Sequence, residues 1–241
     1  MALFKKTKKG SQSAVSAQSS DSRKYILQEN SPFAIKESYK ALRTNVAFSL
    51  PGTESKVVAV TSGDRSEGKS FNTINLAIAF AQIGKKVILL DCDMRLPTVA
   101  SKLGIQQKPG LSNVLVGETP PSEAIRTLFP GFDVLPAGSI PKDPTGLLQS
   151  KMMTSFVAKL REIYDYIFID LPPVTTVTDA SIISPLIDGF LIVVRHELST
   201  FKEETAVLKQ LELSGSKVLG FIYNDSPIED KKYYKKYGYY K

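Results

Sequence analysis

The sequence predicts an α/β domain in which a mostly parallel sheet carries helices on both of its faces. Its short apolar runs are continuous rather than alternating, which is typical of strands that are buried on both sides. Segments with helical spacing of apolar residues separate these runs, and parallel strands need such crossover connections. The length of 241 residues, with 42% hydrophobic and 23% charged residues, suits one domain with a substantial core.

Composition excludes several classes of protein. No run of 18 apolar residues offers a membrane span, and residues 1–6 lack the apolar region of a secretory signal. Ala2 occupies the position where myristoylation requires glycine. The single cysteine, Cys92, permits no internal disulfide, and the single histidine, His196, argues against a zinc site made of Cys and His.

The net charge of +7 is concentrated at the two ends of the chain. Residues 1–10 hold four lysines and no acid, and residues 231–241 hold five lysines and no acid. The remaining 22 basic residues face all 24 acidic residues, so the body of the chain carries a charge of −2. A nucleic-acid-binding domain carries its positive excess on the folded surface, so we expect no nucleic acid as a partner.

The first structural element is expected after a polar N-terminal segment. Residues 1–30 are rich in Lys, Ser, Gln and Ala, which is the composition of a disordered arm. Ser31-Pro32 predicts the start of a helix, and apolar residues follow with a helical period up to Leu50, before Pro51-Gly52. We therefore expect a folded domain over residues 31–224, opened by a helix over residues 31–50.

Six further apolar runs predict the strands of the sheet. They cover residues 57–60, 87–90, 133–135, 166–169, 190–194 and 218–222. Helices are expected over residues 72–83, 145–164 and 200–213. The apolar pattern stops after Asn224, so residues 225–241 are expected to form a flexible tail.

A glycine-rich loop carries the clearest chemical signal. Residues 63–70 match G-x-x-x-x-G-K-[ST] between the strand at 57–60 and the following helix. Backbone N–H groups of such a loop and the N-terminus of its helix bind phosphates, and the alternative is a plain glycine turn with an exposed lysine. Lys69 is expected to contact the β- and γ-phosphates of ATP, and the Ser70 hydroxyl to coordinate Mg²⁺. The expected nucleotide-binding residues of this segment are Gly63, Asp64, Arg65, Ser66, Glu67, Gly68, Lys69, Ser70 and Phe71.

Three aspartates follow two of the predicted strands. Asp170 follows the strand at 166–169, while Asp91 and Asp93 follow the strand at 87–90. The carboxyl ends of parallel strands meet at one edge of a sheet, so three carboxylates are expected in one small volume. They would repel one another unless a divalent cation neutralised them, although aspartate is also common in ordinary turns.

These segments resemble the Walker A, A′ and B motifs of the bacterial tyrosine kinases, which belong with the deviant P-loop ATPases of cell division and plasmid partition. The matching pieces are residues 61–70, 88–95 and 167–173, and the resemblance extends over residues 31–241. It implies Lys69, Asp91 and Asp93 as catalytic residues, with Asp91 acting as base or orienter for a tyrosine hydroxyl. It further implies a magnesium site formed by Ser70, Asp93 and Asp170, and a contact between Asn224 and the nucleotide base.

The sequence departs from the family pattern at two places. Arg65-Ser66 stands where the family commonly has Pro-Gly, so Arg65 is expected to add a phosphate contact. The oligomerisation segment of the family reads Glu-x-x-Arg-x-x-Arg, and here it consists of Glu37, Lys40 and Arg43. Lysine keeps the charge but lacks the planar fork of arginine, so an ion pair between subunits at Lys40 is expected to be weaker.

The C-terminal tail carries a tyrosine cluster. Five of the ten tyrosines lie within its last eleven residues, at Tyr233, Tyr234, Tyr237, Tyr239 and Tyr240. Five interleaved lysines and the lack of any regular spacing argue against a packed apolar end. The segment from Asp225 onward reaches about 60 Å when extended and about 20–25 Å as a coil, enough for its own site or a neighbour's. The resemblance implies that these tyrosines are autophosphorylation sites.

The resemblance as a whole implies an autokinase that uses ATP and Mg²⁺ and regulates the synthesis and export of capsular or extracellular polysaccharide. It implies a cytoplasmic protein that a separate membrane-embedded activator recruits to the inner face of the plasma membrane. A cognate tyrosine phosphatase and a ring-shaped homo-oligomer are also implied. The main alternative is a partition or division-site ATPase switch without kinase activity, whose members carry a lysine where this chain has Asp64. A scaffold that binds nucleotide without turning it over is a third option.

Overall fold

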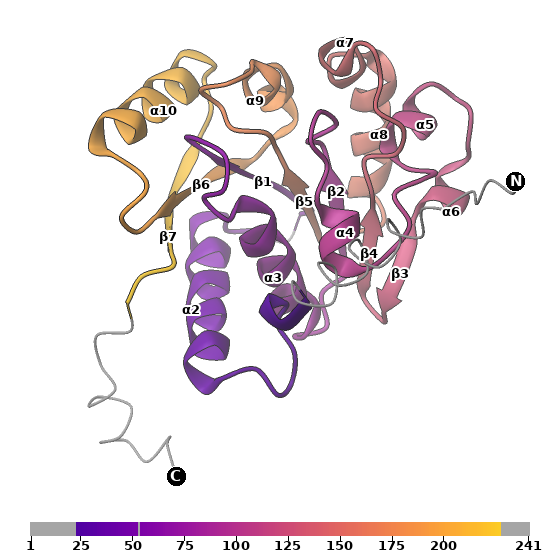
Figure 1. Ribbon diagram of the computed structural model, residues 1–241. Helices are drawn as coiled ribbons and strands as arrows, with labels where there is room; N and C mark the ends of the chain where they lie inside the picture. The colour runs from indigo at the N-terminus through magenta and orange to yellow at the C-terminus, as the bar shows by residue number, and fades with distance from the viewer. Residues whose placement is uncertain (1–22, 53, 228–241) are drawn as a thin grey trace, which may run out of the picture.

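The computed structural model describes residues 23–52 and 54–227, which form a seven-stranded sheet between two layers of helices (Figure 1). The strand order is β3-β4-β2-β5-β1-β6-β7, and all neighbours are parallel except β3 and β4. The predicted mostly parallel α/β fold is confirmed.

The strands coincide closely with the apolar runs of the sequence. Their bounds are β1 Lys56–Ser62, β2 Val87–Asp91, β3 Arg126–Phe129, β4 Phe132–Leu135, β5 Tyr166–Asp170, β6 Gly189–Arg195 and β7 Val218–Asn224. Each of the six predicted runs lies inside one strand. Only β3 was not predicted, because none of its four residues is fully buried and its composition carries no apolar run.

The helices agree with the sequence where they are long. Their bounds are η1 Arg23–Tyr25, α2 Phe33–Ser49, α3 Lys69–Ala81, α4 Val99–Leu103, α5 Leu111–Leu115, α6 Pro121–Ala124, α7 Pro144–Leu148, α8 Lys151–Arg161, α9 Asp179–Ile183, η2 Ser184–Leu186 and α10 Phe201–Leu213. The single helix predicted over residues 145–164 is wrong, because the Ser150 hydroxyl accepts the Met153 N–H and starts a separate helix, α8. The other helices that were missed have five residues or fewer, too few for an apolar period.

Each face of the sheet has its own core. Helices α2, α3 and α4 cover one face, where Val58 and Val60 of β1 pack against Ile74 and Leu76 of α3. The remaining α-helices cover the other face, where Ala59 packs in the same cluster as side chains of α8 and α10. Because successive side chains of a strand point to opposite faces, the same strands contribute apolar side chains to the cores under both helical layers.

The N-terminal arm predicted over residues 1–30 is too long at its C-terminal end. Leu27 is only 6% exposed, and its N–H donates to Asn75 Oδ1 of α3 at 2.8 Å. Residues 1–22 lie outside the described residues, as do residues 228–241 with all five tail tyrosines. Within the described ranges, no helix has both the length and the apolar character that a membrane crossing requires.

Candidate nucleotide and phosphoryl-transfer site

The three motifs of the sequence meet at the carboxyl edge of the central strands. β1 runs into the loop 63–68, which leads directly into α3. β5 lies between β1 and β2, and its last residue, Asp170, is the register partner of Val60 on one side and Asp91 on the other. The fold therefore brings together segments that lie about 100 residues apart in the sequence.

The loop 63–68 has a backbone that requires glycine at its end. Gly68 caps α3 with a φ of 94°, in the left-handed region. A Cβ atom on Gly68 would lie 2.2 Å from Asn224 Nδ2, which donates to the carbonyl of Glu67 at 2.9 Å. Asn224, predicted from the sequence to contact the base, thus lies against the loop. The close approach of the Asn224 side chain to the glycine backbone of this loop fits a loop that binds phosphate through its N–H groups.

We expect Gly68→Ala to lower nucleotide affinity and to reduce the free energy of unfolding by about 1–2 kcal/mol. Alanine at this φ is strained, and its methyl group would displace Asn224 from the loop. Gly84→Ala is the matched control, because Gly84 has a φ of 82° but no neighbouring atom within 4 Å. Thermal unfolding should shift in both variants, whereas nucleotide affinity should fall only in Gly68→Ala. Equal affinities in the two variants would contradict the steric argument.

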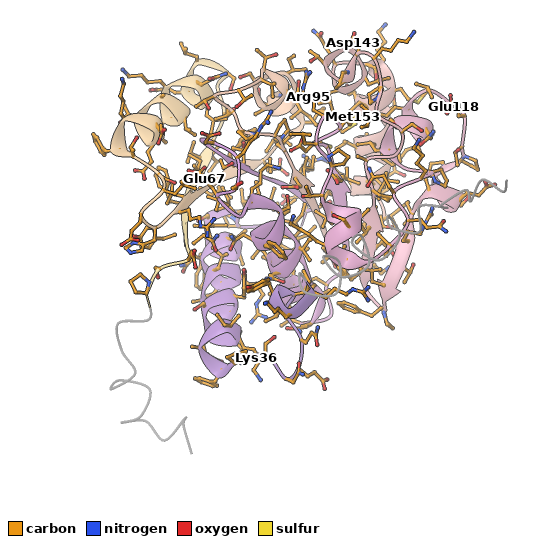
Figure 2. The ribbon with its side chains drawn as sticks, viewed as in Figure 1. Lys36, Glu67, Arg95, Glu118, Asp143 and Met153 are labelled. Carbon is orange, nitrogen blue, oxygen red and sulfur yellow. The ribbon has the colours of Figure 1, made fainter. Side chains whose placement is uncertain are left out.

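The buried carboxylate of Glu67 makes hydrogen bonds that stabilise the loop 63–68. Glu67, labelled in Figure 2, is 2% exposed. Its Oε2 accepts the Asp64 N–H at 3.0 Å, and its Oε1 accepts the Ser199 hydroxyl. The side chain of Glu67, a residue predicted to bind nucleotide, therefore already has hydrogen-bond partners within the protein. Its partner Ser199 was not singled out from the sequence, because an isolated serine after a strand carries no motif.

The loop is also held from the ends of β6 and β7. Arg195 Nη1 donates to the Ser66 carbonyl at 2.9 Å, and Nη2 of the same guanidinium pairs with Asp225 Oδ2 at 2.8 Å. Asp225 is the first residue of the predicted tail. The loop is thus connected to the root of the C-terminal segment, a relation that the sequence did not indicate.

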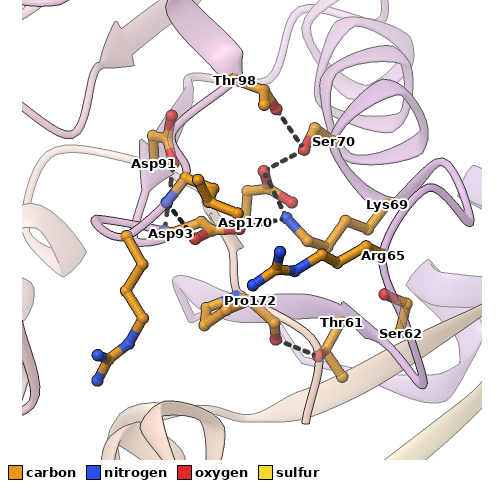
Figure 3. A network of polar contacts seen from close by, with 12 residues as sticks. Thr61, Ser62, Arg65, Lys69, Ser70, Asp91, Asp93, Thr98, Asp170 and Pro172 are labelled. Atoms are coloured by element: carbon orange, nitrogen blue, oxygen red, sulfur yellow. Dashed lines mark hydrogen bonds and ion pairs between the residues drawn. The ribbon is translucent and has the colours of Figure 1, made fainter. Parts of the chain in front are cut away.

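Lys69 lies between two carboxylates (Figure 3). Its Nζ is 2.8 Å from Asp93 Oδ2 and 3.8 Å from Asp170 Oδ2. Burial alone would lower the pKa of the Lys69 ammonium, but Asp170 and Asp93 outweigh burial, and the pKa is raised. Lys69 is therefore fully charged at neutral pH and available to a polyphosphate.

Ser70 and Asp170 form the second part of this cluster. The Ser70 hydroxyl donates to Asp170 Oδ2 at 2.6 Å and accepts the Thr98 hydroxyl at 3.0 Å. Asp170 is fully buried, and burial raises its pKa although Lys69 and the Ser70 hydroxyl act in the opposite direction. A hydroxyl beside a carboxylate is a suitable oxygen donor set for Mg²⁺, which usually takes only one or two protein groups together with phosphates and water.

Asp91, the third of the aspartates expected in one small volume, has hydrogen-bond partners in the backbone. Asp91 is fully buried, and its two oxygens accept the N–H groups of Asp93 and Val99, each at 3.2 Å. Burial, followed by the charge of Asp170, raises the pKa of Asp91. Across residues 23–52 and 54–227 no group of three or more His, Cys, Asp or Glu side chains is placed to hold a metal ion. The reason is that Asp91 orients the backbone after β2 while Lys69 separates the other two carboxylates.

Arg65, Gly63 and Phe71, which were also predicted to bind nucleotide, make different contacts within the protein. Arg65 is exposed, and the carboxylate of Asp64 accepts the Arg65 N–H at 2.6 Å. The Gly63 carbonyl accepts the Thr175 hydroxyl, which ties the loop to the segment after β5. The Phe71 ring meets Tyr25 edge to face, with 5.7 Å between the ring centroids.

A second buried carboxylate fixes the segment after β2. Asp179, at the start of α9, is fully buried and accepts Arg95 Nε and Nη2, each at 3.2 Å, and the Thr145 hydroxyl at 3.0 Å. Arg95 lies on the loop that also carries Asp93. Asp179 could not be singled out from the sequence, because an aspartate in the first turn of a short helix is ordinary.

The three residues predicted for oligomerisation all belong to α2. Lys40 Nζ pairs with Glu37 Oε1 at 2.7 Å, and both side chains are exposed. Arg43 Nη1 donates to the Ala79 carbonyl of α3 at 2.9 Å. Each of the three therefore has a partner within its own chain.

Comparisons with known proteins agree with this geometry. The family ParA, described as NUBPL iron-transfer P-loop NTPase, matches residues 53–240. The chain is 37% identical to the tyrosine-protein kinase YwqD of Bacillus subtilis over 85% of both chains. It is 34% identical to the putative tyrosine-protein kinase CapB of Staphylococcus aureus, over 85% of this chain and 90% of that protein.

Solved structures show the same relation. The kinase domain of the Escherichia coli tyrosine kinase ETK superposes with a TM-score of 0.75 at 28% identity, covering 80% of this chain and 77% of that one. The septum site-determining protein MinD of Pyrococcus horikoshii, complexed with Mg-ADP, has a TM-score of 0.59 at 26% identity over 70% of both chains. The tyrosine kinases are thus more similar to this chain, in identity and in superposition, than this division-site protein.

Proposed function

The chain belongs to the bacterial tyrosine kinases, a group of ParA-type P-loop NTPases, and on that premise we propose that it phosphorylates tyrosines of its own C-terminal segment. The observation that carries the proposal is the position of Lys69 between Asp93 and Asp170, beside the Ser70 hydroxyl. These groups lie where a glycine-capped helix begins, so charge and backbone donors face the same small volume. In such a site, phosphoryl transfer depends on positioning and charge neutralisation.

ATP is the proposed phosphoryl donor. Backbone N–H groups of the loop 63–68 and the start of α3 would face its phosphates, and Lys69 would leave Asp93 to contact them. Asn224 would contact the base from the end of β7. The MinD structure, which holds Mg-ADP, supports this assignment for a related fold.

Ser70 and Asp170 are proposed to hold Mg²⁺, with Asp93 as a further ligand. The ion would neutralise charge that develops on the phosphates during transfer. Ser70 Oγ uses one of its two lone pairs to accept the Thr98 hydroxyl, so the other would be left for the metal ion. Asp93 becomes available to the metal when Lys69 turns to the nucleotide.

Asp91 is proposed to act by orienting the segment that carries Asp93. Its two oxygens already accept backbone N–H groups, and its side chain is fully buried, so a phenol does not reach it directly. The resemblance leaves a role as base or as orienter open, and this geometry favours the orienting role. During transfer the phenol oxygen would bond to the γ-phosphorus, and the bond from that phosphorus to the bridging oxygen would break so that ADP leaves. The phenol proton would pass to an oxygen of the transferred phosphoryl group or to water.

The tail tyrosines are the proposed acceptors: Tyr233, Tyr234, Tyr237, Tyr239 and Tyr240. β7 is parallel to β6 and β1, so the chain leaves the sheet at the edge that carries the loop 63–68. The ion pair between Arg195 and Asp225 places the root of the tail beside this loop. Such a tail is long enough to reach its own site or that of a neighbouring subunit.

The proposed biological role is regulation of capsular or extracellular polysaccharide synthesis and export, at the inner face of the plasma membrane. The family resemblance supports a membrane-embedded activator, a cognate tyrosine phosphatase and a ring-shaped homo-oligomer as partners. The exposed pair Glu37–Lys40 offers charged groups on the outside of α2 for contacts between subunits.

A chain truncated after residue 230 is expected to lose its phosphotyrosine signal while retaining its affinity for nucleotide. The truncation removes all five proposed acceptors and leaves every residue of the described site in place. Purified full-length and truncated proteins are incubated with Mg-ATP and probed with a phosphotyrosine antibody, and nucleotide binding is measured in parallel. Phosphotyrosine on the truncated chain would place the acceptors elsewhere. ATP hydrolysis without phosphotyrosine on either chain would favour the division-type switch.

A further inference from the structure

The hydroxyl of Tyr39 is a junction between α2 and α3. It donates to Asn72 Oδ1 at 3.1 Å and accepts Asn75 Nδ2 at 3.1 Å. Asn72 is 4% exposed and Asn75 is 2% exposed, so neither amide can replace this partner with water easily. Burial raises the pKa of Tyr39 above its ordinary value, which keeps the hydroxyl protonated and able to donate.

Asn72 carries this contact to the nucleotide loop. Its Nδ2 donates to the Gly68 carbonyl at 3.1 Å, and its backbone N–H donates to the same oxygen at 3.0 Å. The Gly68 carbonyl and the Lys69 N–H belong to one planar peptide unit and point in opposite directions. Holding the carbonyl therefore fixes the direction of an N–H group that, in loops of this kind, binds phosphate.

Asn75 connects the same hydroxyl to the N-terminal segment. Its Oδ1 accepts the Leu27 N–H at 2.8 Å, and its Nδ2 donates to the Tyr25 carbonyl at 2.9 Å. Tyr39 thus lies where α2, α3 and the segment before α2 meet. Loss of the hydroxyl would leave one acceptor on Asn72 and one donor on Asn75 without their partner.

We infer that Tyr39 is a positioning residue of the nucleotide site, which sets the Gly68–Lys69 peptide through Asn72. The inference rests on the proposed role of this loop in binding ATP. The inference also gives α2 a second function. Two hydrogen bonds, from Tyr39 to Asn72 and from Asn72 to Gly68, connect this helix to the phosphate-binding N–H group, so a displacement of α2 would change the direction of that group. The outer side of α2 carries the exposed pair Glu37–Lys40.

Tyr39→Phe tests the inference, because it keeps the ring and removes only the hydroxyl. The dissociation constant of a fluorescent ATP analogue with Mg²⁺ is expected to rise about three- to tenfold, the range of one hydrogen bond. In steady state, KM for ATP is expected to rise with kcat within about twofold, since a misdirected loop weakens binding more than the transfer step. Amide hydrogen exchange of the loop 63–70 in the nucleotide-free protein should become faster.

Tyr164→Phe is the matched control. The Tyr164 hydroxyl donates to Asp133 Oδ2 at 2.7 Å, just before the start of β5 and therefore at the opposite edge of the sheet. This variant should lower thermal stability by a similar amount without changing nucleotide affinity or exchange in the loop. A purely structural role for Tyr39 would make the two variants alike.

The outcomes are separable from those that concern the proposed function. If the wild-type chain does not bind the analogue, the proposed function fails. If the wild type binds and Tyr39→Phe binds equally well with unchanged loop exchange, the inference is overturned. Should Tyr39→Phe not fold, Asn72→Ala removes the same contact to Gly68 from the other side, and unchanged affinity in that variant would overturn the inference too. When both variants fold, the double variant is expected to bind no more weakly than Asn72→Ala alone.

Discussion

Lys69→Met is expected to reduce tyrosine phosphorylation at least ~100-fold, the loss that follows removal of one charge-stabilising group from a transferring centre. The ammonium group of Lys69 is in direct contact with Asp93 and also lies within ion-pair distance of Asp170. Methionine keeps the length of the side chain but offers no charge to a phosphate. Phosphotyrosine formed per unit time with Mg-ATP is the measurement.

The same substitution is expected to destabilise the nucleotide-free protein. Lys69 and Asp93 have side chains that are 12% and 6% exposed, and Asp170 is fully buried. Removing one partner of a buried pair leaves uncompensated charge, at a cost of about 3–5 kcal/mol. Asp170, whose pKa is already raised by burial, responds by binding a proton, so the loss of stability should be large at pH 7.5 and smaller near pH 4.5.

Lys69→Arg separates the two effects. Arginine keeps a positive charge near Asp93 and Asp170, so most of the stability should be retained, while its planar fork cannot take the position of the lysine ammonium. Thermal unfolding curves of wild type, Lys69→Arg and Lys69→Met are compared at both pH values. Full activity in Lys69→Met would remove Lys69 from the phosphoryl-transfer site.

The phosphate-binding loop and the aspartates at the strand ends could be predicted from the sequence, because each is recognised from residues that are close together in the chain. The loop 63–70 is contiguous, and its position between a strand and a helix is visible in the apolar pattern. The meeting of Asp91 and Asp170 follows from one rule, that the carboxyl ends of parallel strands share an edge, and the register confirms that they are neighbours. Local spacing and topology together were sufficient for these residues.

Long-range hydrogen bonds were not predictable in the same way. Arg195 reaches the Ser66 carbonyl across 129 positions, and Arg95 reaches Asp179 across 84. Neither pair has a spacing that a period or a motif would reveal. Tyr39 lies in the helix predicted over residues 31–50, and the helical period of that segment does not indicate that its hydroxyl makes two buried contacts.

The direction of the Asp91 carboxylate could not be predicted from the sequence, for a physical reason. The end of β2 fixes the position of the Asp91 backbone but not the direction of its carboxylate. Two backbone N–H groups, of Asp93 and Val99, satisfy this buried carboxylate and turn it toward the chain. Side-chain capping likewise divided the predicted helix 145–164 at Ser150, since a hydroxyl that accepts a backbone N–H does not change the apolar pattern.

Asp170→Asn is expected to give the opposite change in stability with a comparable loss of activity. Burial raises the pKa of Asp170, so between the unfolded pKa and this raised value the folded state binds more protons than the unfolded state. Its stability contribution therefore falls as pH rises through that window. Asparagine cannot ionise and keeps an acceptor for the Ser70 hydroxyl, so the variant should melt above wild type at pH 7.5, and the difference should shrink as the pH falls toward the unfolded pKa.

Addition of Mg-ATP should reverse this order. A ligand that binds only the folded state raises stability in proportion to RT ln(1 + [L]/Kd), and wild type should gain this increment. Asp170→Asn lacks the negative charge proposed to hold Mg²⁺, so its melting temperature should barely move and its phosphotyrosine signal should fall at least ~100-fold. Asp133→Asn, at a carboxylate of β4 that accepts the Tyr164 hydroxyl at 2.7 Å, serves as the control and should keep the increment. An Asp170→Asn variant that Mg-ATP stabilises as much as wild type would contradict the assignment of Asp170 to the metal, because the increment depends on the charge that the substitution removes.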